Sequence, residues 1–329
     1  MGQTHMEAYR ALPNVEIAAG VDKDPENQRK VKERFGVKVY SGVGRVLNDE
    51  SITIIDICLP TNLHRRFTEK ALAAGKHVLC EKPMALTVRE AMRMAEAADQ
   101  AGRYLMVAQV LRFWPEYVKA KEIIDSGQLG RLLSLCCTRR SATPGWSYQG
   151  WLMQPQASGG AALDLHIHDT DWICHVTGRP RAVSSTGYKS ERGWEQIVTN
   201  YFFEGMVAAS AEGNWGFAES FPFRAAFSAM LEHGQIEFDS ALSPSLRVYR
   251  KGAAEPEYPE VPAVIAGEAA AGGNLQTLGG YFLEIKYFVD CVDKGEPPSI
   301  VTPQDGVQAV EVTLAEIKSA ETGKMVKLP

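Results

Sequence analysis

The sequence predicts an α/β protein in which a doubly wound parallel sheet is followed by an α+β domain with an open-faced, mainly antiparallel sheet. In the first part of the chain, apolar runs alternate with amphipathic helices, which is typical of parallel sheets. Further on, strand-like runs follow one another through short turns, which is typical of antiparallel sheets. We therefore expect one domain over residues 1–110 and a second over residues 111–329.

The expected elements of the first domain are marked by local signals. After the strand VEIAAGV, Asp24 supplies a helix N-cap, Pro25 the first helical position and Gly36 the stop. The run ITIIDICLP is apolar and β-branched, as strands buried on both faces of a parallel sheet are. Two further strands are expected at KHVLC and YLMVAQV, each after a helix.

The second domain is expected to begin with a helix near residues 115–125 and the strand LLSLCCTRR. A loop rich in Gly, Pro and Trp over residues 142–160 leads into a helix over about residues 164–176. Several strand-like runs follow between residues 181 and 249, and two helices end the chain.

Composition excludes several classes of function. The chain has 329 residues and a formal net charge of −5, which gives no electrostatic footprint for nucleic acid. No apolar run reaches the ~18 residues that a membrane helix needs. The six cysteines have no CxxC spacing, so we expect reduced thiols in a cytoplasmic protein that binds neither nucleic acid nor membrane.

A first candidate site follows the strand KHVLC. Glu81, Lys82 and Pro83 stand there at the edge where open α/β sheets bind ligands. Pro83 favours extended geometry at Lys82, which presents the lysine side chain instead of packing it along a helix. A partly desolvated lysine is a candidate proton donor or oxyanion partner. The alternative is a solvated Glu-Lys pair at a strand end.

A second candidate site lies in SGGAALDLHIHDTDW. Asp164 and His168 are four residues apart, so on a helix both point the same way. A carboxylate near an imidazole holds its tautomer and tunes its basicity, as a general base requires. The alternative is a capping aspartate followed by a histidine packed against the sheet. His166 lies on another helical face and is expected to be structural.

The same stretch combines two histidines with acidic residues, a pattern that also suits a metal site. A zinc site of that kind needs further histidines, but the chain has seven, of which His5, His64 and His77 fall in the first domain. We therefore expect no metal.

Together these motifs resemble the glucose-fructose oxidoreductase and inositol dehydrogenase family (Gfo/Idh/MocA). The resemblance extends over essentially the whole chain, including DICLPTNLHRRFTEKAL, VLRFWPEY and TPQDGVQAVEVTLAEIKSA. It implies a Rossmann-type dinucleotide-binding domain, then a domain for substrate binding and oligomerisation, in a homodimer or homotetramer. It further implies an NAD(P)-dependent oxidoreductase that transfers a hydride between nicotinamide and a secondary alcohol or ketone of a sugar, inositol or related polyol.

The resemblance also implies roles for single residues. Lys82, Asp164 and His168 are the expected catalytic residues, with His168 as acid/base and Asp164 orienting it. The expected cofactor-binding residues are Gly2, Asp22, Pro60, Thr61, Asn62, His64, Glu81 and Lys82. The expected substrate-binding residues are Arg112, Trp151, Asp171 and Tyr281. Two of these have alternatives, because Tyr281 belongs to a helical stripe typical of a core and Trp151 either walls a sugar site or pins its loop.

Asp22 bears on the choice of cofactor. It follows the strand VEIAAGV, where a carboxylate accepts hydrogen bonds from the adenosine ribose and repels a 2′-phosphate. This favours NAD over NADP, although Lys23 beside it weakens the preference. The alternative is that Asp22 is a turn residue before the Asp24 cap.

The beginning of the chain departs from the family pattern. The family has a strand and a glycine-rich turn ending M-G-x-x-H, whereas MGQTH matches only the tail, with Gly2 as the last glycine and His5 as the histidine. Two explanations stay open: the natural chain begins upstream of Met1, which the intact remaining cofactor residues favour, or the product is shortened and binds NAD poorly. Without that strand, the flanks of its two neighbours are expected to be exposed.

Two other functions stay open on the same fold. One is a glycoside-cleaving enzyme that uses NAD transiently, by oxidation, elimination and re-reduction. The other is a non-catalytic NAD-binding regulator, against which the Lys82, Asp164 and His168 set argues because a binding module needs no acid/base pair.

Overall fold

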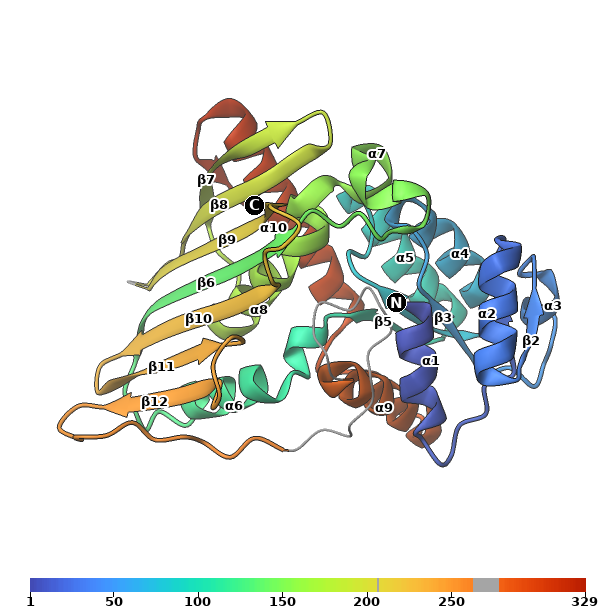
Figure 1. Ribbon diagram of the computed structural model, residues 1–329, viewed down its shortest axis with the longest axis horizontal. Helices are drawn as coiled ribbons and strands as arrows, with labels where there is room; N and C mark the ends of the chain where they lie inside the picture. The colour runs from blue at the N-terminus through green and yellow to red at the C-terminus, as the bar shows by residue number, and fades with distance from the viewer. Residues whose placement is uncertain (206, 263–277) are drawn as a thin grey trace.

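The computed structural model describes residues 1–205, 207–262 and 278–329. Two units lie side by side, one built on parallel strands and the other on one broad sheet (Figure 1). The first unit runs through α1 (Gly2–Arg10), β1 (Ala19–Val21), α2 (Pro25–Phe35), β2 (Lys38–Tyr40), α3 (Gly44–Leu47), β3 (Ile54–Ile57), α4 (Thr61–Ala73), β4 (His77–Glu81), α5 (Val88–Ala101) and β5 (Leu105–Ala108).

The helix signals expected in the first unit are confirmed. The Asp24 side chain accepts a hydrogen bond from the Glu26 N–H and so caps α2. At the other end of α2, Gly36 takes the left-handed conformation that glycine adopts without strain. Both ends of this helix are thus determined by residues next to them in the sequence.

The parallel strand pairing expected in the first domain is confirmed, but the strands form two sheets instead of one. β1 pairs with β2, while β3, β4 and β5 pair in that order. Within the described residues, no strand of one sheet is hydrogen-bonded to a strand of the other. The strands that face each other across this division are only partly buried, with Val21 40% exposed at the end of β1, whereas Leu79 of β4 is fully buried. The expected exposure of two neighbouring strand flanks is therefore present.

The second unit contains one mixed sheet of eight strands in the order β12-β11-β10-β6-β9-β8-β7-β13. Every neighbouring pair is antiparallel except β6 and β9, which are parallel. Its elements are α6 (Pro115–Asp125), β6 (Leu132–Ala142), α7 (Pro155–Ser158), α8 (Ile167–Thr177), β7 (Ala182–Ser190), β8 (Gly193–Phe202), β9 (Ala208–Phe217), β10 (Arg224–Leu231), β11 (Gly234–Asp239), β12 (Leu246–Arg250), α9 (Gly279–Lys294), α10 (Pro303–Thr322) and β13 (Val326–Lys327).

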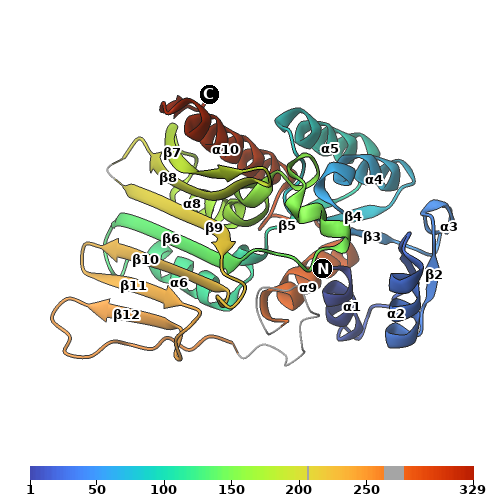
Figure 2. The ribbon, with the colours of Figure 1, turned by 45° about the horizontal axis from the view of Figure 1, so that its top comes forward.

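One face of this sheet is covered by helices and the other is open (Figure 2). Strand β10 shows the alternation that this requires, because Phe227 and Ala229 are buried while Ser228 and Met230 are exposed. Among the described helices, none is both long and apolar enough to cross a membrane.

The last two helices return to the first unit. Ile285 and Phe288 of α9 and Val310 of α10 belong to the same apolar core as Leu79 and Met106 of the parallel strands. Residues from 278 on therefore pack on both units, and a division of the chain at residue 110 stays a prediction.

Gly213 of β9 gives a test of this packing. A Cβ added there would lie 2.5 Å from Cβ of His166, closer than the two side chains can approach, so the helix layer would have to shift. We expect Gly213→Ala to lower the free energy of unfolding by about 1–3 kcal/mol, as overpacked core positions do. Gly42→Ala is the control, since its Cβ meets nothing within 4 Å, and should stay within about 0.5 kcal/mol of the wild type in urea unfolding. Equal losses in both variants would show that β9 does not press on His166.

Candidate active site

The Lys82 side chain joins the two units. It follows β4, and its Nζ donates hydrogen bonds to the Asp164 backbone carbonyl at 2.6 Å and to Asp164 Oδ1 at 3.3 Å. The two side chains are only 14% and 16% exposed. The lysine from the first candidate site and the aspartate from the second are thus in direct contact.

Asp164 lies in a π-helical turn, Ala162–His166, which leads into α8. In a regular α-helix, the Asp164 carbonyl would accept the backbone N–H of His168, whereas π-helical hydrogen bonds reach one residue further. Such turns are rare and are frequent at functional sites. Here the turn coincides with the carbonyl that accepts from Lys82.

His168 lies one turn beyond Asp164 and is partly buried. Burial, followed by the positive charges of Lys82 and Arg139, lowers the pKa of His168 well below its ordinary value. The imidazole is therefore neutral near pH 7 and able to accept a proton. Because the Lys82 charge contributes to the lowered pKa of His168, these two side chains interact electrostatically.

The expected pairing of Asp164 with His168 is contradicted. The Asp164 carboxylate contacts Lys82, and His168 Nδ1 is buried without a hydrogen-bond partner in the part of the chain that the structure describes. The four-residue spacing brought the two residues to one region, but the π-helical turn and Lys82 decide which contact forms. Asp164 thus holds the lysine, and among the described residues it forms no hydrogen bond that would fix the tautomer of His168.

Arg139 is a member of the site that the sequence analysis missed. It is 3% exposed, and its Nε and Nη2 donate to both carboxylate oxygens of Asp169, at 2.8 and 2.9 Å. Asp169 directly follows His168, so this ion pair lies under the candidate base. From the sequence, Arg139 is expected to be a solvated arginine at the end of a strand. Only the structure shows that it pairs with the buried Asp169.

Arg112 and Asp171, two of the expected substrate-binding residues, instead form a buried ion pair. Arg112 Nε and Nη2 donate to the two oxygens of Asp171 at 2.9 and 2.8 Å. Arg112 Nη1 donates to the carbonyl of Ile300 and lies 3.1 Å from Asp305. Arg112 is 7% exposed and Asp171 is 1% exposed, and their polar groups are engaged with each other. Their contact with substrate stays a prediction.

The described contacts of His64, Tyr281 and Trp151 are with other parts of the protein, and their contact with a ligand stays a prediction. The two ring nitrogens of His64 lie 2.9 and 2.7 Å from the backbone carbonyls of Pro83 and Leu59. The ring therefore connects the segments that contain these two residues, and both of its polar atoms are engaged. Tyr281 is 9% exposed in α9, and Trp151 packs on a small apolar cluster around Leu152. Both positions agree with the core and loop-pinning alternatives.

The remaining expected cofactor residues lie at the carboxyl edge of the parallel strands. Pro60 precedes α4, whose first residues are Thr61 and Asn62. Asp22 follows β1, where its carboxylate accepts hydrogen bonds from the Asp24 N–H and the Asn27 side chain. The turn role of Asp22 is therefore present, and the carboxylate is also held in a fixed position.

Gly2 and Glu81 complete this edge. A Cβ on Gly2 would lie 3.6 Å from Cβ of Cys58, which places the N-terminus of α1 beside the end of β3. The Glu81 carboxylate accepts from the Lys82 N–H at 3.0 Å.

Two buried polar side chains show that this edge fits a polar ligand. The Thr61 hydroxyl and both polar atoms of the Gln109 side chain have no hydrogen-bond partner among the described residues. Thr61 opens α4 after β3, and Gln109 directly follows β5. Unpaired polar groups are costly when buried, so hydrogen bonds from a bound dinucleotide at this edge suit them.

Comparisons with known proteins agree with this arrangement. Residues 1–109 match the family model described as "Oxidoreductase family, NAD-binding Rossmann fold", and residues 117–237 match the "GFO/IDH/MocA C-terminal domain". A myo-inositol 2-dehydrogenase of Thermotoga maritima is 25% identical over 347 aligned positions, covering 100% of this chain and 96% of the relative. A 1,5-anhydro-D-fructose reductase of Ensifer adhaerens is 27% identical and covers 88% of this chain and 84% of its own.

The structure of levoglucosan dehydrogenase in complex with NADH and levoglucosan superposes with a TM-score of 0.83. It is 25% identical and covers 100% of this chain and 96% of its own. Since two models of one family match residues 1–109 and 117–237 in order, the chain belongs to the Gfo/Idh/MocA family of NAD-binding oxidoreductases.

Proposed function

We propose that this protein transfers a hydride between NAD and a secondary alcohol or ketone of a sugar, an inositol or a related polyol. The observation that carries the proposal is the contact of Lys82 with Asp164, beside a neutral His168. The relatives named above are a myo-inositol dehydrogenase, an anhydrofructose reductase and a levoglucosan dehydrogenase, which supports this class of substrate.

The roles follow from the charge state of each group. In the oxidative direction, neutral His168 accepts the proton of the substrate hydroxyl. The Lys82 ammonium donates a hydrogen bond to the oxygen as negative charge develops on it, and Asp164 keeps the ammonium in place. When bound, the nicotinamide supplies the hydride acceptor. Asp22, the segment 60–62 and Glu81 would hold the cofactor.

The open face of the eight-stranded sheet supports the proposal that the protein is a homo-oligomer. Apolar Met230 is 48% exposed on this face, between small and polar neighbours such as Ser228. Sedimentation equilibrium should give two or four times the chain mass of 36.1 kDa. A monomer at micromolar concentration would contradict this part of the proposal.

Removal of the lysine amine tests the mechanism. A panel of inositols, aldoses and their lactones is first screened for NADH formation by the wild type. We expect Lys82→Ala to lower kcat on the active compound by about 10²- to 10³-fold, because a group that stabilises developing charge is lost. NADH affinity, measured by fluorescence titration, should change little.

The matched control is Lys30→Ala, since Lys30 is exposed on α2 of the same unit. This variant should retain wild-type turnover. The proposed mechanism is wrong if Lys82→Ala retains it as well.

The lowered pKa of His168 predicts a pH-dependent contribution to stability. Its pKa in the folded protein lies below the ordinary value of 6.5, so between these two values the unfolded state binds the additional proton. The wild type should therefore lose stability relative to His168→Gln as the pH falls below about 6.5, by up to about 1.4 kcal/mol per pH unit. Urea unfolding of both proteins from pH 8 to pH 5 measures this difference. Parallel stability profiles would mean that His168 is not held neutral by the fold.

A further inference from the structure

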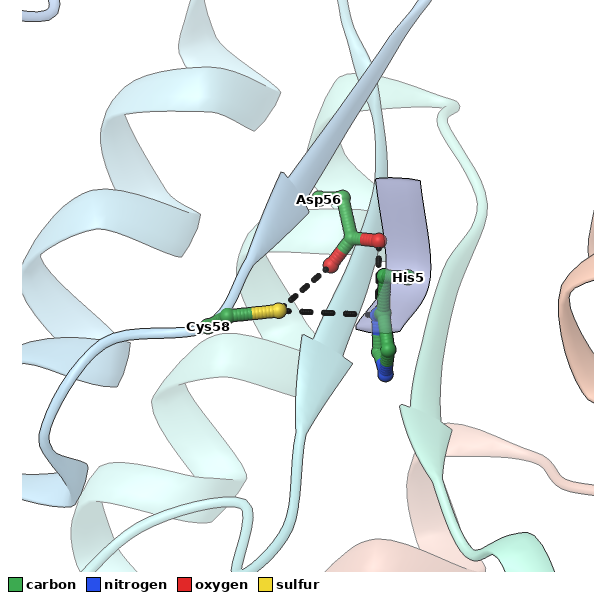
Figure 3. A group of neighbouring side chains, drawn as sticks. All are labelled: His5, Asp56 and Cys58. Carbon is green, nitrogen blue, oxygen red and sulfur yellow. Dashed lines mark hydrogen bonds and ion pairs between the residues drawn. The ribbon is translucent and has the colours of Figure 1, made fainter. Parts of the chain in front are cut away.

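Three side chains with metal-binding atoms meet at the end of β3, outside the contact of Lys82 with Asp164 (Figure 3). His5 comes from α1, Asp56 from β3 and Cys58 from the segment that follows β3. His5 Nδ1 lies 2.8 Å from Asp56 Oδ2 and 3.5 Å from Cys58 Sγ, and Sγ lies 3.3 Å from Asp56 Oδ1. Three different ligand types therefore converge on one point.

The spacing of these atoms is close to that of a tetrahedral metal site. Zinc binds sulfur at about 2.3 Å and histidine nitrogen or carboxylate oxygen at about 2.0–2.2 Å, so its ligand atoms lie roughly 3.3–3.5 Å apart. The two distances that involve Cys58 Sγ, 3.3 and 3.5 Å, already have these values. Cys58 Sγ contacts Asp56 Oδ1 whereas His5 Nδ1 contacts Oδ2, so binding of an ion through one oxygen would require the Asp56 carboxylate to turn.

A second observation concerns the other ring nitrogen of His5. Nε2 lies 3.1 Å from Glu81 Oε1, and both side chains are buried. Histidines that bind a metal through one nitrogen usually donate the other N–H to a carboxylate, which fixes the tautomer and the ring orientation. Glu81 is the carboxylate beside this nitrogen, within ion-pair distance but without hydrogen-bond geometry among the described residues.

The charge around His5 is also unbalanced. Glu284 of α9 is fully buried, and neither of its carboxylate oxygens has a hydrogen-bond partner in the described ranges. Burial, and then the charge of Glu81, raises the pKa of Glu284 well above its ordinary value. Glu284 is thus held in its neutral form, and the carboxyl groups beside the imidazole are those of Asp56 and Glu81, which a divalent cation would compensate better than the imidazole proton does.

We propose that His5, Asp56 and Cys58 bind a divalent transition-metal ion of the zinc class, with water as the fourth ligand. Thiolate, imidazole and carboxylate are the mixed ligands that zinc accepts, whereas magnesium and calcium prefer oxygen. On binding, the ion replaces the proton of the Cys58 thiol and the proton between His5 Nδ1 and Asp56, and both protons go to solvent. The site would fasten α1 to the end of β3. Its entrance is on the side of Asp56, whose side chain is 17% exposed.

Cobalt(II) is the probe, because cobalt bound to a thiolate gives an absorption band in the near ultraviolet and tetrahedral cobalt gives strong visible bands. The full-length, metal-free, tag-free chain is titrated with Co²⁺ and then with Zn²⁺. We expect one Co²⁺ per chain, both sets of bands, and their loss as Zn²⁺ displaces the cobalt. Because the readout is spectroscopic, its failure leaves the proposed dehydrogenase function untouched.

Matched variants assign the ligands. Cys58→Ser should abolish the near-ultraviolet band and weaken binding by about ten-fold or more, and Asp56→Asn should weaken binding while the sulfur band remains at saturation. Cys136→Ser is the control, because Cys136 is exposed on the open sheet face and should leave all bands unchanged. Circular dichroism checks that each variant is folded.

A measurement without variants keeps the proposal testable if the ligand variants do not fold. Zinc should protect Cys58 of the wild type from iodoacetamide but leave Cys136 reactive, as read by peptide mass spectrometry. Equal labelling of Cys58 with and without zinc, absence of the cobalt–thiolate band, or a band that survives Cys58→Ser would overturn the assignment.

Discussion

The contact between the Lys82 ammonium and Asp164 is the interaction on which the candidate active site depends. It joins the end of β4 to the π-helical turn before α8, two segments that are 82 residues apart in the chain. An ammonium that is 14% exposed has lost most of its water, and the carbonyl and carboxylate of Asp164 replace that hydration. The same charge acts on His168 and helps to keep it neutral. One lysine thus contacts the turn and, after burial, contributes to the neutral state of the candidate base.

Two buried ion pairs hold α8 where this contact needs it. Asp169 binds Arg139 of the broad sheet, and Asp171 binds Arg112 at the junction of the two units. Removing one partner from such a pair leaves an uncompensated buried charge, at a cost of about 3–5 kcal/mol. Because the two aspartates follow His168 by one and three residues on the same helix, these pairs restrict its position.

A third set of contacts holds this region to the last helix of the chain, and it includes the uncharged Thr170 hydroxyl. His166 Nε2 lies 3.1 Å from Glu316 of α10, and Thr170 donates to the same carboxylate at 3.0 Å. All three side chains are fully buried. Gly213 permits this packing, since any side chain there would meet His166. The π-helical turn is therefore held by the sheet below it and by α10 beside it, which explains how an otherwise unfavourable turn persists.

The sequence by itself determined the alternation of strands and helices, the capped ends of α2, the second sheet and the two motifs around Lys82 and His168. These features depend on residues that are neighbours in the chain, so the sequence pattern predicts them. The sequence did not reveal that Asp164 contacts Lys82 instead of His168, nor that Arg112 and Asp171 neutralise each other. It also did not reveal that His5 meets Asp56 and Cys58, more than fifty residues away. Which charged groups lose water together, and therefore must pair, is decided only when distant segments pack.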